Sequence, residues 1–327
     1  MLSPVITRVV DSEEEQTIQP VLKRKSRRRS GVSEINRGLR SGWAIYFVLI
    51  IVLFYFAVIY YYPIIYTLIL SLYRWSFIEQ TFLGLKNYIS LIHDEVFTSS
   101  VRNTLIYVIG TSLITVIGGL ALALSVDRVS KQSQRLSVVY KSFFFVPVVV
   151  SFAAVSIVWK WIYDPQAGIL NYALSTIGIP KIGWLTNPEV ALWSIIIVGS
   201  WQNIGFNMVI LLGGLKSIPD VYHEAATLEG ASWFTILTRI TIPLMRPVFL
   251  FTIVSTVVLA FKVFTPVFVM TSGGPLNSTT VVVHQIYIQG FKFWQMGYAA
   301  SICIVFLILV VGLSLVQMKV MKLEKNT

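Results

Sequence analysis

Long hydrophobic segments separated by shorter polar ones dominate this chain of 327 residues. Six of them come close to or exceed the roughly 20 residues that cross a bilayer as a helix. They cover about residues 42–72, 104–126, 140–163, 190–215, 248–270 and 297–318. Only helices and closed barrels satisfy their backbone polar groups in lipid, and these continuous runs lack the alternation of barrel strands. The pattern therefore predicts an all-α membrane protein with six transmembrane helices.

The polar segments at the two ends bound this membrane domain. Residues 1–40 are polar and charged and have no helical or strand periodicity, which predicts a cytoplasmic tail that is largely disordered. The first apolar segment is longer than the roughly 7–15 residues of a cleavable signal peptide's core, so we interpret it as a retained span. The membrane domain is expected over 41–320, followed by a short cytoplasmic C-terminus over 321–327.

Composition and charge support the membrane interpretation and predict an orientation. Hydrophobic residues make up 55% of the chain and charged residues 13%, about half the share usual in a soluble domain. Much of the net charge of +11 lies in residues 23–29, just before the first span, which indicates an orientation signal and contact with membrane lipids rather than nucleic acid. With both termini cytoplasmic, the cytoplasmic segments carry most of the 26 lysines and arginines.

An acidic segment rich in small residues, within 216–247, connects the fourth and fifth spans on the predicted cytoplasmic side. Ser217 is expected to cap a helix that begins about two residues later, and Gly230 to stop it. A second short helix is expected to follow and to end at Pro243 and Pro247. The prediction is a helix, a glycine bend and a helix along the membrane surface; an interfacial connector without further function is the alternative.

The spacing within this segment resembles the EAA loop of permease subunits from bacterial binding-protein-dependent ABC importers. Glu224-Ala225-Ala226 is followed after three residues by Gly230 and, nine residues further, by Ile240-Thr241-Ile242-Pro243. Other segments resemble the maltose/glycerol-phosphate type of sugar permease, among them residues 82–88, 159–165, 201–207 and 271–275. The resemblance covers roughly residues 43–320 and implies the type I importer permease fold, multi-pass in the bacterial cytoplasmic (inner) membrane.

The resemblance also implies a function and a set of partners. The chain would be the permease subunit of an ATP-driven carbohydrate importer and form half of an alternating-access pathway for a sugar or oligosaccharide. Implied partners are a second homologous permease, two ATP-binding subunits and an extracytoplasmic sugar-binding protein. The EAA loop would dock on the ATPase through Glu224, Ala225, Ala226, Gly230 and Pro243. No G-x-x-x-x-G-K-[ST] loop occurs, so the chain is expected to be no enzyme and to hold no cofactor, with ATP and magnesium on the partner ATPase.

Candidate residues for the substrate pathway combine amides with flat apolar surface, which suits sugar hydroxyls and rings. Span four supplies Trp201, Gln202, Asn203, Phe206 and Asn207, and the resemblance adds Ser255, Thr256 and Lys262 on span five. Interhelical hydrogen bonding is the alternative role for the amides. Lys262 suggests an anionic sugar if it faces the pathway; the alternative is that it reaches toward the outer interface or pairs with backbone carbonyls.

Other transport mechanisms and chemistries find less support in the sequence. An ion-coupled secondary sugar carrier is the alternative function, but such carriers commonly place carboxylates inside the membrane, and none of the 15 acidic residues lies mid-span. His93, His223 and His284 are scattered without metal-ligand spacing. Gly118 and Gly119 in span two are expected to allow close helix packing.

Overall fold

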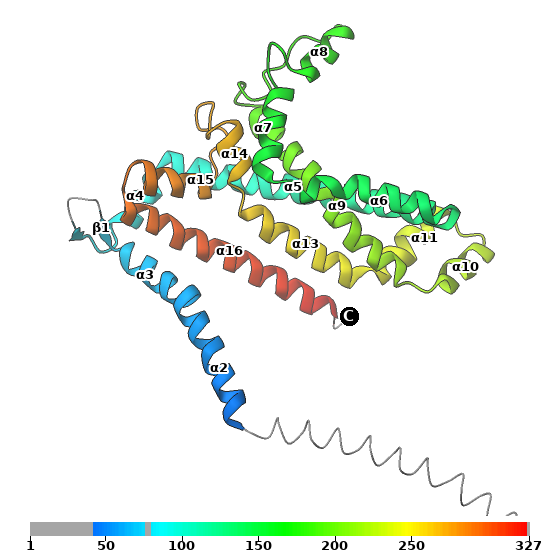
Figure 1. Cartoon of the computed structure of the whole chain (residues 1–327), viewed down its shortest axis with the longest axis horizontal. Coiled ribbons are helices and arrows are strands. Elements are labelled where there is room, and N and C mark those ends of the chain that lie inside the picture. Colours follow the sequence, from blue (N-terminus) through cyan, green and yellow to red (C-terminus); the bar gives the residue numbers. More distant parts are fainter. Residues whose placement is uncertain (1–41, 76–79, 326–327) are drawn as a thin grey trace, which may run out of the picture. The chain divides into compact units, whose positions relative to one another are not determined.

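The computed structural model describes residues 42–75 and 80–325. The tail expected over residues 1–40 lies outside these described residues. The chain divides into two parts, Met1–Tyr66 and Thr67–Thr327, and each is described by itself. Within the first part the described residues are helical throughout, and the second part contains every other element (Figure 1).

The described residues form a helical protein with one small hairpin. In chain order the elements are α2 (Gly42–Phe56), η1 (Ala57–Tyr61), α3 (Tyr62–Leu70), β1 (Tyr73–Trp75), β2 (Gln80–Phe82), α4 (Lys86–His93), α5 (Glu95–Gln132), α6 (Gln134–Val149), α7 (Phe152–Ile162), α8 (Ile169–Thr176), α9 (Ala191–Lys216), α10 (Asp220–Leu228), α11 (Trp233–Ile236), η2 (Leu237–Thr241), α12 (Ile242–Leu244), α13 (Arg246–Phe261), α14 (Thr265–Met270), α15 (Val282–Tyr287), η3 (Ile288–Lys292) and α16 (Met296–Lys325). The label η marks a π-helix. Strands β1 and β2 pair antiparallel, with Arg74 opposite Thr81.

Four helical stretches among the described residues are long and apolar enough to cross a membrane: Tyr46–Leu70, α5, α9 and Met296–Lys319. Two bent helix pairs raise the number to six if each pair is one span. One pair is α6 and α7, bent by 97°, and the other is Trp233–Leu244 and α13, bent by 73°. The third apolar segment is thus broken between α6 and α7, where the sequence pattern predicts a continuous helix. The second bend lies just before the fifth segment, which is itself interrupted at residues 262–264, between α13 and α14.

The break between α6 and α7 has a local cause and a distant partner. Pro147 lies inside α6 near its end, where it lacks an N–H and its ring crowds the carbonyl one turn earlier. Val150 then adopts an extended conformation, which leaves its carbonyl outside the helical ladder. The side-chain amide of Gln202 on α9 donates to this carbonyl oxygen at 2.9 Å. A residue 52 positions away therefore stabilises the break.

Helix α5 is much longer than the apolar segment over 104–126 that the sequence pattern identifies. It begins at Glu95 because the Asp94 carboxylate accepts from the backbone N–H groups of Val96 at 2.8 Å and Phe97 at 3.1 Å. Its 38 residues reach Gln132, a length of about 57 Å. This exceeds the roughly 30 Å of a bilayer's hydrocarbon core, so α5 carries charged residues beyond both ends of its apolar part.

Helices α5 and α9 pack against each other along their lengths and form the centre of the Thr67–Thr327 part (Figure 1). Glycines permit the close approach. A Cβ atom on Gly119 would lie 2.9 Å from the Cβ atom of Asn207, and one on Gly118 would collide with Ile204. Gly205 on α9 lies against the backbone carbonyl of Phe144 on α6 in the same way. The prediction that Gly118 and Gly119 allow close helix packing is confirmed.

Candidate functional site

A cavity of about 220 Å³ lies among α5, α7, α9 and α13, next to the short break before α14. We call it the central cavity. Its lining residues combine amides, hydroxyls and aromatic rings with aliphatic side chains: Tyr107, Thr111, Val148, Phe152, Gln202, Asn203, Phe206, Asn207, Thr256, Leu259, Ala260, Lys262, Val263, Phe264, Thr265 and Pro266. The cavity therefore offers hydrogen-bonding groups within an apolar wall, as sites for small polar ligands do.

Each of the three amide side chains of α9 makes one hydrogen bond within the protein. Asn207 Oδ1 accepts from the Thr256 hydroxyl at 3.1 Å, which links α9 to α13. Asn203 donates to the carbonyl of Gly199 on its own helix at 2.8 Å, while Gln202 holds the α6–α7 break. Of the remaining groups, Gln202 Oε1 and Asn207 Nδ2 are buried and have no hydrogen-bond partner among the described residues. Buried polar groups without a partner cost roughly 1–3 kcal/mol each, so each of the two atoms would gain free energy from a polar partner.

Most of the pathway residues expected from the sequence lie at this cavity. Gln202, Asn203, Phe206 and Asn207 line it from α9, and Thr256 and Lys262 line it from the α13 side.

Two of the expected residues lie elsewhere. Trp201 packs edge-to-face on Trp159, with ring centroids 5.6 Å apart, and lines a separate apolar hollow. The Ser255 hydroxyl donates to the Phe251 carbonyl of its own helix at 2.8 Å. The periodicity of a helix explains the split, because neighbouring residues face directions about 100° apart.

Lys262 lies at the end of a helix instead of within one. Helix α13 ends at Phe261, and the backbone N–H of Lys262 closes its last turn on the carbonyls of Leu259 and Ala260. Residues 262–264 then separate α13 from α14. The lysine is exposed and lines the central cavity, so it brings a positive charge to a place where the span is broken.

The sequence pattern did not identify the cavity residues on α5 or those next to the break between α13 and α14. Tyr107 and Thr111 line the cavity from α5. They are four residues apart and so share one helix face, and polar atoms at this spacing within an apolar run are a signal that could have identified them. Phe264 and Thr265 reach the cavity through the break after α13, and Pro266, which follows them, was the sequence signal for that break.

His284 is buried beside the aromatic residues of this region. It is 2% exposed, and its ring lies 6.3 Å from Phe264 and 6.4 Å from Phe268, centroid to centroid. Burial lowers the pKa of His284, and the positive charge of Lys292 lowers it further. The imidazole is therefore neutral at physiological pH. Among the described residues no group of three or more histidine, cysteine, aspartate or glutamate side chains could hold a metal ion.

The loop over 216–247 folds into short helices, as the sequence predicts, but with different boundaries. Helix α10 ends at Leu228, Gly230 adopts a φ of 77°, and Ser232 caps α11 by accepting from the Thr235 N–H at 3.3 Å. The expectation for Ser217 is wrong. Its hydroxyl donates to the Gly214 carbonyl at 2.7 Å and so closes α9 instead of starting α10.

The prolines of this loop also act differently from the prediction. Pro243 and Pro247 each lie in the first turn of a helix, α12 and α13, and do not end one. A proline is tolerated in a first turn because its missing N–H has no intrahelical acceptor there. The bend of 73° falls between Leu244 and Arg246.

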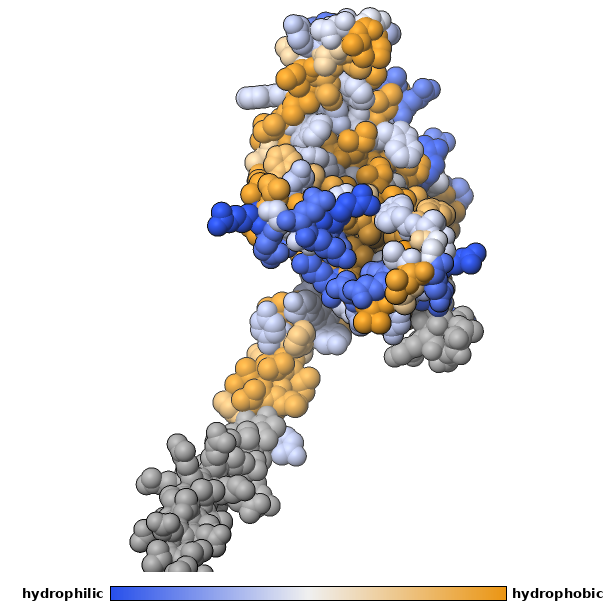
Figure 2. All heavy atoms as spheres, turned by 90° about the vertical axis from the view of Figure 1, so that its right-hand side faces the viewer, coloured by the Kyte–Doolittle hydropathy of each residue, from blue (hydrophilic) through white to orange (hydrophobic). Residues whose placement is uncertain are grey.

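Helices α10 and α11 expose much of their surface at one end of the Thr67–Thr327 part (Figure 1). Val221 is 69% exposed and Leu228 88%, and Trp233 and Phe234 are exposed next to them. Glu224 is also exposed, and its carboxylate has no ion pair among the described residues. Figure 2 faces this end and shows hydrophilic and hydrophobic side chains side by side. The surface thus combines uncovered apolar side chains with a carboxylate available for pairing.

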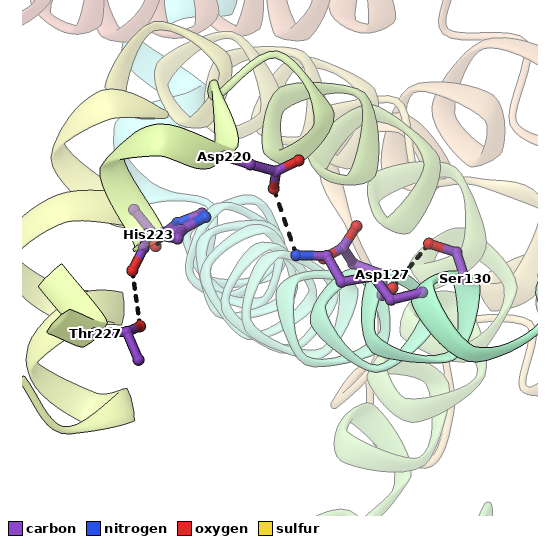
Figure 3. A network of polar contacts seen from close by, with 7 residues as sticks. Asp127, Ser130, Asp220, His223 and Thr227 are labelled. Carbon is purple, nitrogen blue, oxygen red and sulfur yellow. Dashed lines mark hydrogen bonds and ion pairs between the residues drawn. The ribbon is translucent and has the colours of Figure 1, made fainter. Parts of the chain in front are cut away.

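Two polar contacts hold α10 to the rest of the chain. Asp220 Oδ1 lies 3.5 Å from Lys131 Nζ at the end of α5, and His223 Nε2 lies 3.2 Å from the hydroxyl oxygen of Thr241 in η2. Figure 3 shows Asp220 and His223 on α10 together with Asp127 on α5. Thr241 is buried, whereas Lys131 and Asp220 are exposed. The histidine contact is therefore the better shielded of the two.

A bundle of membrane helices whose broken members meet at a polar cavity is typical of transport permeases. The comparison with known proteins agrees. Residues 115–320 match the family described as the binding-protein-dependent transport system inner membrane component, and the chain belongs to this family. It is therefore a multi-pass inner membrane protein and a permease subunit, not an enzyme.

Relatives of known sequence cover most of the chain. The probable ABC transporter permease protein YurN of Bacillus subtilis is 35% identical over 81% of this chain and 91% of its own length. The lactose transport system permease protein LacF of Rhizobium radiobacter is 34% identical over 80% of this chain and 88% of its own.

Two solved structures share the fold. One is a bacterial ABC transporter involved in the import of the acidic polysaccharide alginate, at 22% identity and a TM-score of 0.76, covering 88% of this chain and 98% of that one. The other is a bacterial alginate ABC transporter in complex with an alginate pentasaccharide-bound periplasmic protein, also at 22% and 0.76, covering 86% and 94%. The fold is thus that of an ABC importer permease.

Proposed function

We propose that this chain forms one half of a sugar pathway that alternates between two access states, with the central cavity as its substrate contact. Two residues that line the central cavity carry the proposal, Gln202 and Asn207. Each has a buried amide atom, Gln202 Oε1 and Asn207 Nδ2, that has no hydrogen-bond partner among the described residues. One is an acceptor and the other a donor, and a sugar hydroxyl can act as both. Aromatic rings such as Tyr107 and Phe206 add flat apolar surface for the sugar ring.

The size of the cavity fits a shared pathway. Its 220 Å³ is below the roughly 300–1,000 Å³ of typical ligand pockets. A second permease subunit that supplies the facing wall would enlarge it. The relatives favour carbohydrate as the cargo, because one of them is named for lactose and the structural neighbours carry alginate.

Energy for transport would come from ATP-binding subunits that contact α10 and α11. Uncovered Val221, Leu228 and Phe234 would enter a groove on the ATPase, and Glu224 would pair with a basic residue there. Ala225 and Ala226 leave room for close approach beside that carboxylate. Gly230 supplies the bend between the two helices, and Pro243 begins the helix that leads toward α13. A periplasmic sugar-binding protein would deliver the substrate, as in the solved alginate complex.

A panel of sugars on the reconstituted complex tests the proposal. Neutral mono- and oligosaccharides and uronic-acid oligosaccharides are compared by their stimulation of ATP hydrolysis in proteoliposomes. We expect one of these groups to stimulate, and Thr256→Val to reduce the apparent affinity about tenfold, because the bond that orients Asn207 is lost. Ser255→Ala is the matched control, because Ser255 is the neighbour of Thr256 and its hydroxyl does not line the cavity. Stimulation by another class of solute and by no sugar would overturn the proposal.

A further inference from the structure

A larger hollow of about 860 Å³ lies at the loop-facing end of α5. We call it the α5 groove. Helix α5 forms one side, and the end of α9 together with α10, α11 and η2 forms the other. Its lining residues are mainly apolar, with charged ones among them: Ile117, Leu120, Ala121, Leu124, Ser125, Asp127, Arg128, Lys131, Leu215, His223, Trp233, Ile236, Leu237 and Thr241. The central cavity does not share any of these residues.

The α5 side of the groove changes from apolar to basic along one helix face. Ile117, Leu120 and Leu124 follow one another at intervals of three and four residues, and Arg128 and Lys131 continue the same series. From Ile117 to Arg128 the helix rises by about 16 Å. This is close to half of the roughly 30 Å hydrocarbon core of a bilayer. The face therefore matches the length of one leaflet, which would place its positive charges at the level of the headgroups.

The basic end of the groove carries positive charge, from Arg128 and Lys131, that can attract an anion. Lys131 is partly compensated, because it lies 3.9 Å from Asp127 and 3.5 Å from Asp220. Arg128 is exposed and has no ion pair among the described residues. A guanidinium pairs well with phosphate oxygens through two parallel N–H bonds. Basic pockets between membrane helices bind the headgroups of anionic lipids.

We propose that the α5 groove binds an anionic phospholipid of the surrounding bilayer. An acyl chain would lie along Ile117, Leu120 and Leu124, and the phosphate would contact Arg128, with Lys131 as a second cation. Trp233 would pack beside the boundary between chain and headgroup, where tryptophan side chains commonly lie. A zwitterionic phosphatidylcholine fits less well, because its quaternary ammonium adds a positive charge beside the two cations. The site is separate from the central cavity and does not depend on the identity of the transported substrate.

Tryptophan fluorescence in proteoliposomes tests this site directly. The full chain is reconstituted with phosphatidylglycerol or phosphatidylcholine carrying brominated acyl chains, which quench nearby tryptophan. The contribution of Trp233 is the difference between the unaltered protein and Trp233→Phe. We expect brominated phosphatidylglycerol to reach half of its maximal quenching at a mole fraction about fivefold lower than brominated phosphatidylcholine, the preference that one cation near a membrane surface provides.

Variants that remove or keep charge separate the lipid site from general membrane contact. Arg128→Gln should bring the two lipids to equal quenching, whereas Arg128→Lys should keep the preference. Arg135→Gln on α6 is the matched control, because it removes the same charge outside the groove. Equal quenching by both lipids in the unaltered protein, or an unchanged preference in Arg128→Gln, would overturn the proposal. Loss of the Trp233 signal when the ATPase or a second permease assembles would also overturn it, since a protein would then fill the groove.

Discussion

The central cavity and the loop helices α10 and α11 are built in opposite ways. The cavity is assembled from helices that the chain itself holds together, and Asn207, one of its main polar residues, is only 1% exposed. The loop helices are attached by few contacts, and Leu228 at their bend is 88% exposed. The chain thus completes most of the first region by its own packing, and it leaves the second open to another polypeptide.

This difference predicts how each region responds to substitution. In the cavity, the same amide of Asn207 stabilises a helix contact with one atom and leaves the other without a partner among the described residues. On the loop helices, most side chains can change without cost to the fold, since they contact little of this chain. Variants of the two regions should therefore separate defects of assembly from defects of coupling.

The largest effect should come from the helix packing that surrounds the cavity. Gly205→Ala places a methyl group against the Phe144 carbonyl, a contact with backbone that cannot move aside easily. We expect little folded protein in the membrane fraction, because overpacking of this kind typically costs about 1–3 kcal/mol. Gly213→Ala on the same helix is the control, since a Cβ atom there meets nothing within 4 Å. Equal yields of both variants in detergent, measured by size-exclusion chromatography, would contradict the close packing.

A change of charge on α10 should abolish coupling without affecting insertion. Glu224→Lys reverses the exposed carboxylate, and Ala226→Trp fills the space beside it. We expect substrate-stimulated ATP hydrolysis by the assembled complex to fall at least about tenfold, as removal of one charged partner at an interface typically costs 2 kcal/mol or more. Glu189→Lys, the same charge reversal on an exposed residue outside the loop helices, should hydrolyse ATP normally. Transport at the normal rate in the two α10 variants would remove the coupling role.

The charge of Lys262 tests the chemistry of the cavity. If the lysine binds an anionic sugar, Lys262→Ala should weaken the apparent affinity for a uronic-acid oligosaccharide by about ten- to a hundredfold, the usual range for a hydrogen bond to a charged group. A neutral oligosaccharide of the same length should lose less than about twofold. The comparison is made by uptake into proteoliposomes. Equal losses for both sugars would show that Lys262 acts on the structure of the break and not on the substrate.

The smallest effect should come from the contact between His223 on α10 and Thr241 in η2, the π-helix that precedes α12 and α13. Thr241→Val removes the hydroxyl that His223 contacts at 3.2 Å. A single hydrogen bond contributes about 1 kcal/mol, so we expect the sugar transported per ATP to fall by about two- to fivefold while ATP hydrolysis continues. Thr238→Val is the matched control, because that hydroxyl bonds only to the Phe234 carbonyl of its own turn among the described residues. An unchanged ratio in Thr241→Val would show that motion reaches α13 by another route.

Features that depend on a short stretch of sequence could be predicted. Hydropathy identified the membrane helices, the small residues of α5 indicated close packing, and Gly230 indicated a bend, because each follows from the residue and its neighbours. Asn203 and Asn207 are four residues apart and share one helix face, and both line the cavity. The same logic failed for Trp201 and Ser255, since the sequence does not say which face of a helix meets the cavity.

Features that depend on distant partners could not be predicted. The sequence pattern predicts a continuous third span, but Pro147 lies near the end of α6 and Gln202 on another helix satisfies the carbonyl of Val150 that the break exposes. The sequence pattern did not locate the end of α13 at Phe261, which brings Lys262 to the cavity, although Pro266 follows within the same apolar run. Ser217 was assigned to the wrong helix because its hydroxyl could reach either one, and the structure selects the carbonyl of Gly214.

The sequence by itself determined that this is a helical membrane protein, and it identified the acidic loop whose spacing resembles that of importer permeases. The first follows from local composition and periodicity, which fix how each segment partitions into lipid. The second rests on a resemblance to a known family in the spacing of a few residues. Only the tertiary structure decided which amide atoms the fold uses and which remain available, as in Asn207, whose oxygen binds Thr256 and whose nitrogen has no partner among the described residues. It also decided that α10 is held through Asp220 and His223. These contacts join residues far apart in the chain, and the packing of whole helices determines which of them meet.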